Sequence, residues 1–192
     1  MSFITCAFYT VDTPYEELIK NLIASLTALS MPYDIAGYPS TGSWVRNAGI
    51  KSQFILKMMR EHQDKNILYV DADAIIHEYP VLFDYIHGDF GCYYHKGGKE
   101  LLSGTLFFKN NGTCLRLLEL WVAAQVASPN EWDQKILQEV ITDHAEAIGL
   151  GIATIPATYV KIFDKMHDAG RPVIEHFQAS RTMRGQIGGY SR

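Results

Sequence analysis

Short hydrophobic runs alternate along this chain with longer segments whose apolar residues recur every three or four positions. The short runs are typical of buried strands and the longer segments of amphipathic helices. Strands are expected over residues 3–9, 33–38, 67–70, 89–94, 101–108 and 173–177. Helices are expected from Thr13-Pro14 to Met31-Pro32 and over residues 50–61, 79–86, 113–126 and 131–147. Strands that alternate with helices predict an α/β fold, with a doubly wound, mostly parallel (mixed) sheet flanked by helices.

The strand expected at residues 67–70 ends in two carboxylates, Asp71 and Asp73. Aspartate is unfavourable in strands and is rarely buried without a partner, so a pair at the end of a buried strand requires a reason. A divalent cation such as Mg²⁺ or Mn²⁺ supplies one, because these ions prefer carboxylate oxygens. Open α/β sheets also bind their ligands at strand ends.

The geometry of the pair stays open at this stage. If the strand continues through both residues, their side chains share one face and point at one ion. If the chain has already turned, the pair lies in a loop. The alternative without a ligand is a pair of turn residues that cap a following helix.

Length and composition narrow the class of protein. The 192 residues predict one domain over residues 1–192, large enough for a hydrophobic core, and 47% of them are hydrophobic. The formal charge of −4 gives no reason to expect nucleic-acid binding. No signal peptide is recognised at the N-terminus, and no apolar run is long enough for a transmembrane segment. Cys6, Cys92 and Cys114 show no metal or redox spacing, so free thiols and a cytoplasmic location are expected.

Positive charge gathers toward the C-terminus. Residues 161–192 contain six Lys and Arg residues against three Asp and Glu residues. Such a segment either faces an anionic ligand or is a solvated tail, and composition does not decide between the two.

Several motifs, taken together and in order, resemble the GT-A fold glycosyltransferases that use nucleotide-diphosphate sugars. The segment Leu68-Tyr69-Val70-Asp71-Ala72-Asp73 resembles their DxD motif. The other matching segments are Phe8-Tyr9-Thr10, Trp44 to Lys51, Leu102 to Phe108, Glu131-Trp132-Asp133-Gln134 and Ile174 to Arg181. The resemblance covers nearly the whole chain and is strongest to the small nucleotide-diphospho-sugar transferase group.

This resemblance implies a metal-dependent transferase with Mn²⁺ (or Mg²⁺) as cofactor. Asp71, Asp73 and His176 would be the metal ligands, and Asp133 and Gln134 would lie at the reacting centre. The residues that would bind the donor are Tyr9, Thr10, Arg46, Lys51, Asp71, Ser103, Gly104, Gln178, Ser180 and Arg181.

Some of these assignments have a physical argument beside the resemblance. A metal held by carboxylates neutralises the charge that develops on a diphosphate leaving group. Lys51 opposes the dipole if it lies at the start of a helix, and a bound anion would give it a purpose there. Gly104 permits a close approach of a ligand to the backbone, although a β-bulge would also explain a glycine in this strand.

One part of the family pattern is missing. Many relatives resemble His-x-x-Gly-x-x-Lys-Pro-Trp after the histidine, whereas this chain has Gln178-Ala179-Ser180-Arg181. Arg181 is the expected replacement for the lysine, and Arg184 is a further diphosphate candidate.

The function expected from these observations is transfer of a sugar from a nucleotide-diphosphate donor, with UDP favoured by the resemblance, to a hydroxyl of a glycan, lipid-linked or protein acceptor. The chain is short for this fold, so a homo-oligomer could complete the acceptor site. One alternative is a non-catalytic nucleotide-sugar binding protein. The other is a HAD-type phosphatase, although in that class the carboxylate motif follows the first strand and is followed by Thr or Val rather than Ala74.

Overall fold

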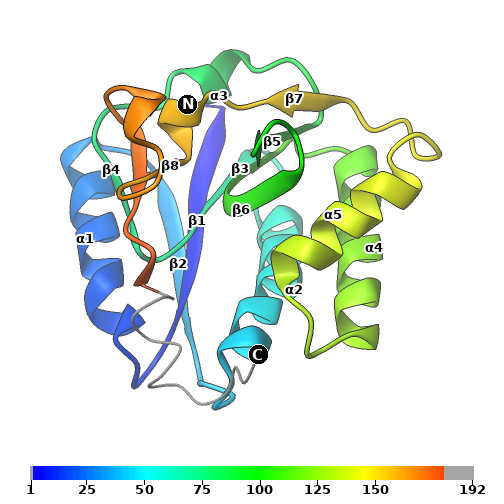
Figure 1. The fold of residues 1–192 in the computed structure, drawn as a ribbon, viewed down its shortest axis with the longest axis horizontal. Helices are drawn as coiled ribbons and strands as arrows, with labels where there is room; N and C mark the ends of the chain where they lie inside the picture. Colours follow the sequence, from blue (N-terminus) through cyan, green and yellow to red (C-terminus); the bar gives the residue numbers. More distant parts are fainter. Residues whose placement is uncertain (1, 180–192) are drawn as a thin grey trace.

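The computed structural model of the protein describes residues 2–179, and a mixed β-sheet forms its centre (Figure 1). This sheet has the strand order β2-β1-β3-β6-β5-β7, and only β6 runs antiparallel to its neighbours. Its strands are β1 (Phe3–Thr10), β2 (Tyr33–Tyr38), β3 (Asn66–Val70), β5 (Phe90–His95), β6 (Glu100–Phe108) and β7 (Ile152–Thr154). A smaller sheet has the order β4-β9-β8, from β4 (Ala74–Ile76), β8 (Lys161–Ile162) and β9 (Ile174–His176).

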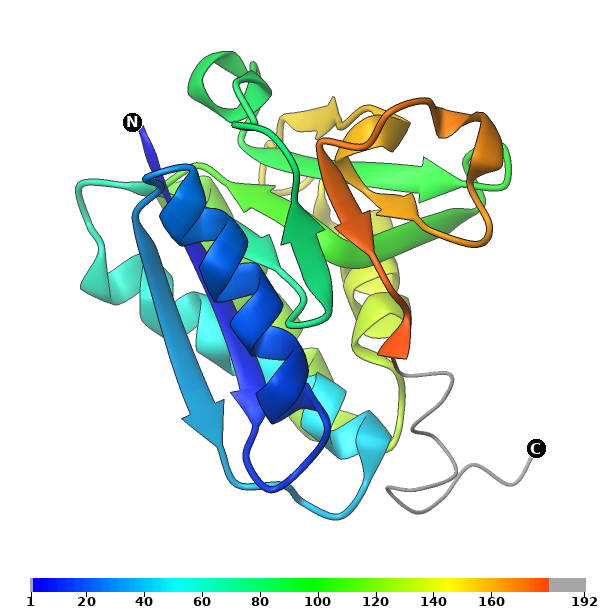
Figure 2. The same cartoon turned by 90° about the vertical axis from the view of Figure 1, so that its left-hand side faces the viewer.

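Helices cover both faces of the central sheet (Figure 2). One face packs against α2 (Trp44–Glu61), α4 (Gly112–Ala127) and α5 (Asp133–His144). The other face packs against α1 (Tyr15–Ala28), α3 (Leu82–Tyr85) and the smaller sheet. Two 3₁₀ turns, Ala157–Tyr159 and His167–Ala169, complete the regular elements of residues 2–179. The predicted fold class, a doubly wound and mostly parallel mixed sheet, is confirmed.

The apolar residues of the central strands explain why two layers of helix form. Along β3, Ile67 and Tyr69 belong to the core on the α2 side, whereas Leu68 and Val70 belong to the core on the α1 side. Successive side chains of a strand point to opposite faces, so a continuous apolar run needs cover on both.

The start of α2 differs from the sequence-based expectation. The helix was expected over residues 50–61 but begins at Trp44, so Gly49 lies inside it. Glycine is a poor helix residue, yet here it leaves space for α4, since a Cβ on Gly49 would lie 3.3 Å from Gln125 Nε2. Helix packing therefore overrides the local preference, and the residues after Gly49 lie in the helix interior.

No helix within residues 2–179 is long and apolar enough to cross a membrane.

Candidate active site at the carboxyl ends of β1 and β3

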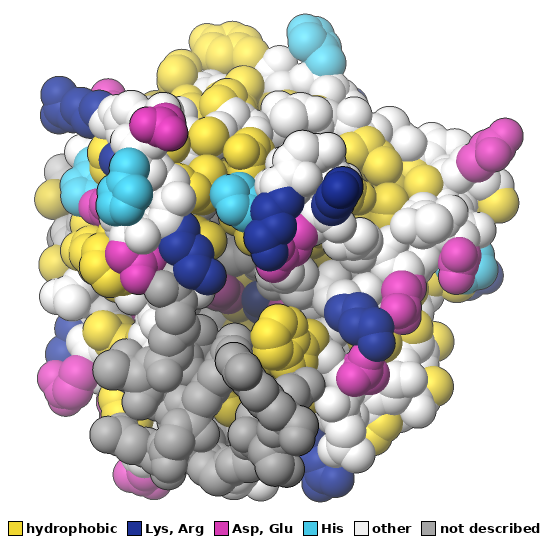
Figure 3. Space-filling model, viewed as in Figure 1, with side chains coloured by type: hydrophobic (Ala, Val, Ile, Leu, Met, Phe, Trp, Pro, Cys, Tyr) yellow, Lys and Arg dark blue, Asp and Glu magenta, His cyan; other side chains and the backbone are white. Residues whose placement is uncertain are grey.

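A cavity of about 330 Å³ opens where β1 and β3 end, between α2, α5 and the smaller sheet. In the space-filling view, acidic and basic side chains surround a hollow near the centre of this face (Figure 3). The cavity brings together most of the predicted site residues: Tyr9, Thr10, Lys51, Asp71, Asp73, Ser103, Gly104, Asp133, Gln134, His176 and Gln178.

The two carboxylates lie in a tight turn between β3 and β4. Strand β3 ends at Val70, and the backbone N–H of Ala74 donates to the carbonyl of Asp71 at 3.1 Å. Of the two geometries that the sequence left open, the loop is therefore the one observed. No helix follows the turn, so the helix-capping alternative is wrong.

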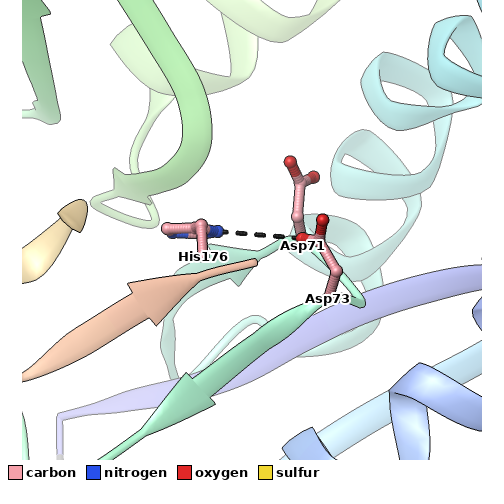
Figure 4. A group of neighbouring side chains, drawn as sticks. All are labelled: Asp71, Asp73 and His176. Carbon is pink, nitrogen blue, oxygen red and sulfur yellow. Dashed lines mark ion pairs between the residues drawn. The ribbon is translucent and has the colours of Figure 1, made fainter. Parts of the chain in front are cut away.

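His176 is brought to the carboxylates by strand pairing. Strand β4 pairs with β9 in antiparallel register, which places Ala74 opposite His176. The side chains of Asp71, Asp73 and His176 converge from the turn and from the end of β9 (Figure 4), and one ligand atom from each lies within 4.8 Å of the others.

Asp73 and His176 are each held through one polar atom, and the other polar atom of each faces the cluster. Asp73 Oδ2 accepts from the Ala179 N–H at 2.8 Å, while its Oδ1 lies 4.0 Å from His176 Nδ1. His176 Nε2 is bonded to the buried hydroxyl of Thr105 at 2.8 Å. An imidazole whose Nε2–H donates to this hydroxyl presents the Nδ1 lone pair toward Asp73, as a metal-binding histidine does.

Within this cluster the charge of Asp73 is the poorly compensated one. Burial and then the charge of Asp71 raise the pKa of the Asp73 carboxyl, against the opposing effect of His176. Burial lowers the pKa of His176 and outweighs the attraction of Asp73 and Asp71, so the imidazole is held neutral. A neutral imidazole beside two carboxylates is a donor set suited to a divalent metal ion.

Gly104 makes room for the cluster. A Cβ on this residue would lie 3.0 Å from His176 Cε1 and 3.3 Å from Asp71 Oδ2. The strand is also irregular here: Gly91 pairs with Phe107 but Tyr93 pairs with Leu102, so residues 103–106 of β6 lie opposite Cys92 alone. The irregular strand offered as one explanation for this glycine is therefore observed, and the side chains of His176 and Asp71 lie close to its backbone.

Lys51 is a buried residue that lines the cavity. It lies two turns inside α2, so the expectation of a lysine at the helix N-terminus is wrong. Its Nζ lies 2.7 Å from Asp133 Oδ2, 3.1 Å from Asp71 Oδ1 and 3.1 Å from Ser103 Oγ. Burial alone would lower the pKa of Lys51, but Asp133 and Asp71 together raise it above its ordinary value. The ammonium group therefore links the carboxylate turn to the start of α5.

Asp133 and Gln134 begin α5 and face the same cavity. Asp133 is buried and also accepts a hydrogen bond from Ser103 Oγ at 2.9 Å. Gln134 donates from Nε2 to Glu100 Oε1 at 3.3 Å and accepts at Oε1 from the Ser103 N–H at 3.4 Å.

The remaining predicted residues have different placements. Tyr9 and Thr10 line the cavity at the end of β1, and Gln178, with φ 52°, turns the chain so that Ala179 reaches Asp73. Arg46 is exposed, is not among the described residues that line the cavity, and donates from Nε to Asn130 Oδ1 at 3.1 Å. Ser180, Arg181 and Arg184 lie outside the described residues.

The lining residues that were not among the predicted site residues include Tyr15, Glu100, Trp132 and Lys165. Trp132 contacts Trp44 edge to face with 5.8 Å between ring centroids, and both residues line the cavity. Lys165 belongs to the basic C-terminal segment, which was the one available signal for it. Lys51 and Lys165 are the only Lys or Arg residues among the described residues lining the cavity.

Comparison with known proteins supports the fold. A glycosyltransferase involved in the glycosylation of the major capsid of PBCV-1 matches with a TM-score of 0.71 at 12% identity, over 96% of this chain and 97% of that one. The glycosyltransferase GlyE of Streptococcus pneumoniae TIGR4 matches in its apo form with a TM-score of 0.65 at 12% identity. A second GlyE structure matches with a TM-score of 0.60 at 14% identity.

The extent of the match differs between these proteins. Each GlyE comparison covers 92% of this chain but only 54% or 55% of GlyE, so the chain spans about half of that protein. No protein-family model and no curated protein matches the chain. At these identities the comparisons show the fold, and this fold is the one that the sequence predicted, that of GT-A-like glycosyltransferases.

Proposed function

We propose that the protein is a metal-dependent glycosyltransferase that moves a sugar from a nucleotide-diphosphate donor, UDP-sugar favoured, to a hydroxyl acceptor. The observation that carries the proposal is the meeting of two clusters in one cavity. Asp71, Asp73 and His176 form a candidate metal site, and the Lys51 ion pair joins it to Asp133 at the start of α5. Glycosyltransferase structures that share the fold support the same reaction class.

A divalent metal ion fits the three proposed ligands. Two carboxylates with one neutral imidazole suit Mn²⁺, because the imidazole favours a transition metal over Mg²⁺. The hydrogen bond that His176 Nε2–H donates to the Thr105 hydroxyl supplies the outer support that metal-binding histidines have, and Gly104 leaves the space. When bound, the ion supplies positive charge beside the diphosphate leaving group.

The donor would lie along the carboxyl ends of β1 and β3. Tyr9 and Thr10 would face the nucleoside, as the resemblance implies, and Lys165 offers a cation at the cavity edge for a phosphate group. We infer that Lys51 acts through its two carboxylates rather than by a direct contact with the diphosphate, because Asp133 and Asp71 already hold its ammonium group. Arg181 remains a proposed diphosphate contact.

At the reacting centre, the protein's own groups would position the donor sugar and exclude water. Lys51 and Ser103 fix the Asp133 carboxylate through Oδ2, and Gln134 is fixed by Glu100 and by the backbone of β6. Preorganised polar groups of this kind stabilise charge as it develops without reorganising. Asp133 would face the sugar or the attacking hydroxyl with a charge that Lys51 partly offsets.

The experiment that tests the proposal is thermal unfolding with UDP, GDP or CDP, each with and without Mn²⁺. A ligand at 100 times its dissociation constant adds about 2.7 kcal/mol to the free energy of unfolding. In a protein of this size the midpoint then rises by roughly 5–10 °C. We expect a rise that needs both Mn²⁺ and one nucleotide, followed by release of that nucleoside diphosphate from the matching sugar donor.

Asp73→Asn is the matched variant. The amide oxygen of Asn keeps an acceptor for the Ala179 N–H, so the variant is expected to fold, and loss of a buried charge beside Asp71 removes a repulsion. The variant should lose the metal-dependent rise. No rise for any nucleotide in the wild type would refute the proposal, and binding without release of a sugar would support the non-catalytic alternative.

Three further assignments belong to the proposal. The catalytic unit would be one domain over residues 1–192. The cytoplasm is the proposed location, because Cys6, Cys92 and Cys114 are buried free thiols, which suit a reducing compartment. A nucleic-acid partner is not proposed, given the formal charge of −4.

A further inference from the structure

A second cavity, of about 340 Å³, lies along α5 beside the hairpin of β5 and β6. It shares Glu100, Trp132 and Gln134 with the central cavity, so the two spaces meet next to the candidate reacting centre. The other lining residues follow one side of α5: Lys135, Gln138, Glu139, Thr142 and Asp143. We call this surface the α5 groove.

The α5 groove is polar and acidic. Its described lining residues include three carboxylates, from Glu100, Glu139 and Asp143, and one cation, Lys135, which lies 3.9 Å from Glu139 and also pairs with Glu131. A hydrogen bond from Lys96, 2.6 Å away, is the largest cause that lowers the pKa of Glu100, which keeps this carboxyl ionised. In Figure 3 acidic side chains gather on the right of this face, with a basic side chain between them.

This chemistry disfavours two of the possible acceptor classes. Trp132 is the only large apolar side chain among the described residues that line the groove, so a lipid chain would find little surface to bury. A phosphate group would be repelled by the excess of carboxylates. Carboxylates and amides in a row, ending at an aromatic ring, instead match a ligand rich in hydroxyl groups.

The groove is also preformed. Gln138 accepts from the Leu101 N–H at 2.9 Å and donates to the Lys99 carbonyl at 3.1 Å, which fixes α5 against the hairpin. Gln134, one helical turn before Gln138, is bonded to the Ser103 N–H and to Glu100. From Gln134 to Asp143 the helix rises by roughly 13 Å, which is the scale of a short oligosaccharide. A rigid polar surface loses little conformational entropy when it binds such a ligand.

We propose that the α5 groove is the acceptor subsite and that the acceptor is a carbohydrate chain, neutral or bearing amino groups, whose terminal sugar reaches the central cavity past Trp132. This inference rests on the proposed function. In the reaction the acceptor hydroxyl oxygen forms a bond to the anomeric carbon, and the bond from that carbon to the diphosphate oxygen breaks. The hydroxyl proton leaves to the diphosphate or to water, and the nucleoside diphosphate departs.

The test measures carbohydrate binding and donor binding separately. An array of neutral, amino-bearing and phosphorylated oligosaccharides, with unglycosylated peptides as further spots, is probed with the protein saturated with Mn²⁺ and the nucleotide that raised its unfolding midpoint. Vesicles containing undecaprenyl phosphate serve as the lipid probe. The variants are Glu139→Lys and Asp143→Lys, both at exposed positions of α5, and the conservative Glu139→Gln. Glu61→Lys, exposed at the end of α2, is the matched charge reversal away from the groove.

We expect retention of neutral or amino-bearing oligosaccharides and a loss of affinity of about 10–100-fold in Glu139→Lys and Asp143→Lys, which corresponds to a hydrogen bond to a charged group. Glu139→Gln should lose less oligosaccharide affinity than Glu139→Lys, and Glu61→Lys should keep the affinity of the wild type. All four variants should keep the nucleotide-dependent rise in midpoint. The inference would be overturned if the protein bound only peptides or vesicles, or if it bound no oligosaccharide. It would also be overturned if the groove variants bound oligosaccharides as tightly as the wild type. None of these results would count against the donor site. Absence of the nucleotide-dependent rise in the wild type would instead count against the proposed function.

Discussion

Two buried aspartates in the same cavity have opposite surroundings. Asp133 lies 2.7 Å from the buried ammonium group of Lys51, so its charge is compensated within the protein. Asp73 has a neutral imidazole and one backbone N–H beside it, and its pKa is raised by burial and by Asp71. The comparison teaches that the protein neutralises the carboxylate at α5 by itself and leaves the carboxylate after β3 uncompensated, in a candidate metal site.

The largest expected effect comes from removing the cation that compensates Asp133. Lys51→Met should lower the free energy of unfolding by about 3–5 kcal/mol, because it leaves Asp133 buried without its cation. The double variant Lys51→Met/Asp133→Asn should recover much of this loss. Urea unfolding of the wild type, both single variants and the double variant measures the coupling. Additive losses would show that the pair is not coupled.

A smaller effect is expected from weakening the candidate metal site around Asp73 and His176. Thr105→Val removes the hydroxyl that holds His176 Nε2 and should lower Mn²⁺ affinity by about 10–100-fold. The affinity can be measured by electron paramagnetic resonance of free Mn²⁺ in a titration. Thr142→Val, at an exposed position of α5, is the control and should leave the affinity unchanged. Equal affinities in wild type and Thr105→Val would remove His176 from the ligand set.

The pH dependence of stability sharpens the comparison further. The pKa of His176 is lowered from 6.5, so below pH 6.5 the unfolded chain binds more protons than the folded one, and stability falls as the pH drops. The raised pKa of Asp73 acts in the opposite direction, since it adds stability at low pH that is lost as the pH rises through its folded value.

The contribution of His176 cannot exceed about 1.4 kcal/mol for each pH unit. Urea unfolding of the metal-free protein at pH 7.5 and 5.5 should show a smaller decrease for His176→Gln than for the wild type. An equal decrease in the two proteins would mean that His176 does not titrate abnormally.

The smallest effect concerns Arg46, which the sequence placed among the donor-binding residues. Its side chain is exposed and bonded to Asn130 outside the cavity lining. Arg46→Ala should change the free energy of unfolding by no more than about 0.5 kcal/mol and leave nucleotide binding intact. Nucleotide-dependent unfolding is the measurement, and a lost midpoint shift would return Arg46 to the donor site.

The sequence predicted the elements whose pattern is local. Short runs of apolar residues indicated the core strands, and the aspartates after Val70 indicated the expected ligand-binding edge. The partners of Lys51 could not be predicted, because Asp71, Ser103 and Asp133 are distant from it in sequence and meet it only in the folded protein. Glu100 and Trp132 were missed for the same reason, since the hairpin and α5 place them beside the cavity through contacts distant in sequence.

The pairing of β4 with β9, which builds the candidate metal site, has a consequence for the order of folding. Each strand has only three residues, and Asp73 and His176 are 103 positions apart in the chain (176 − 73). Closing so long a loop is costly in entropy, and the pairing of two short strands offsets little of that cost. The pairing of β4 with β9 is therefore expected to form late in folding and to open first. An ion bound to both segments would act as a clasp. Slower amide hydrogen exchange in β9 on addition of Mn²⁺ would therefore show that the ion holds the two segments together, even if the central sheet is already fully protected from exchange.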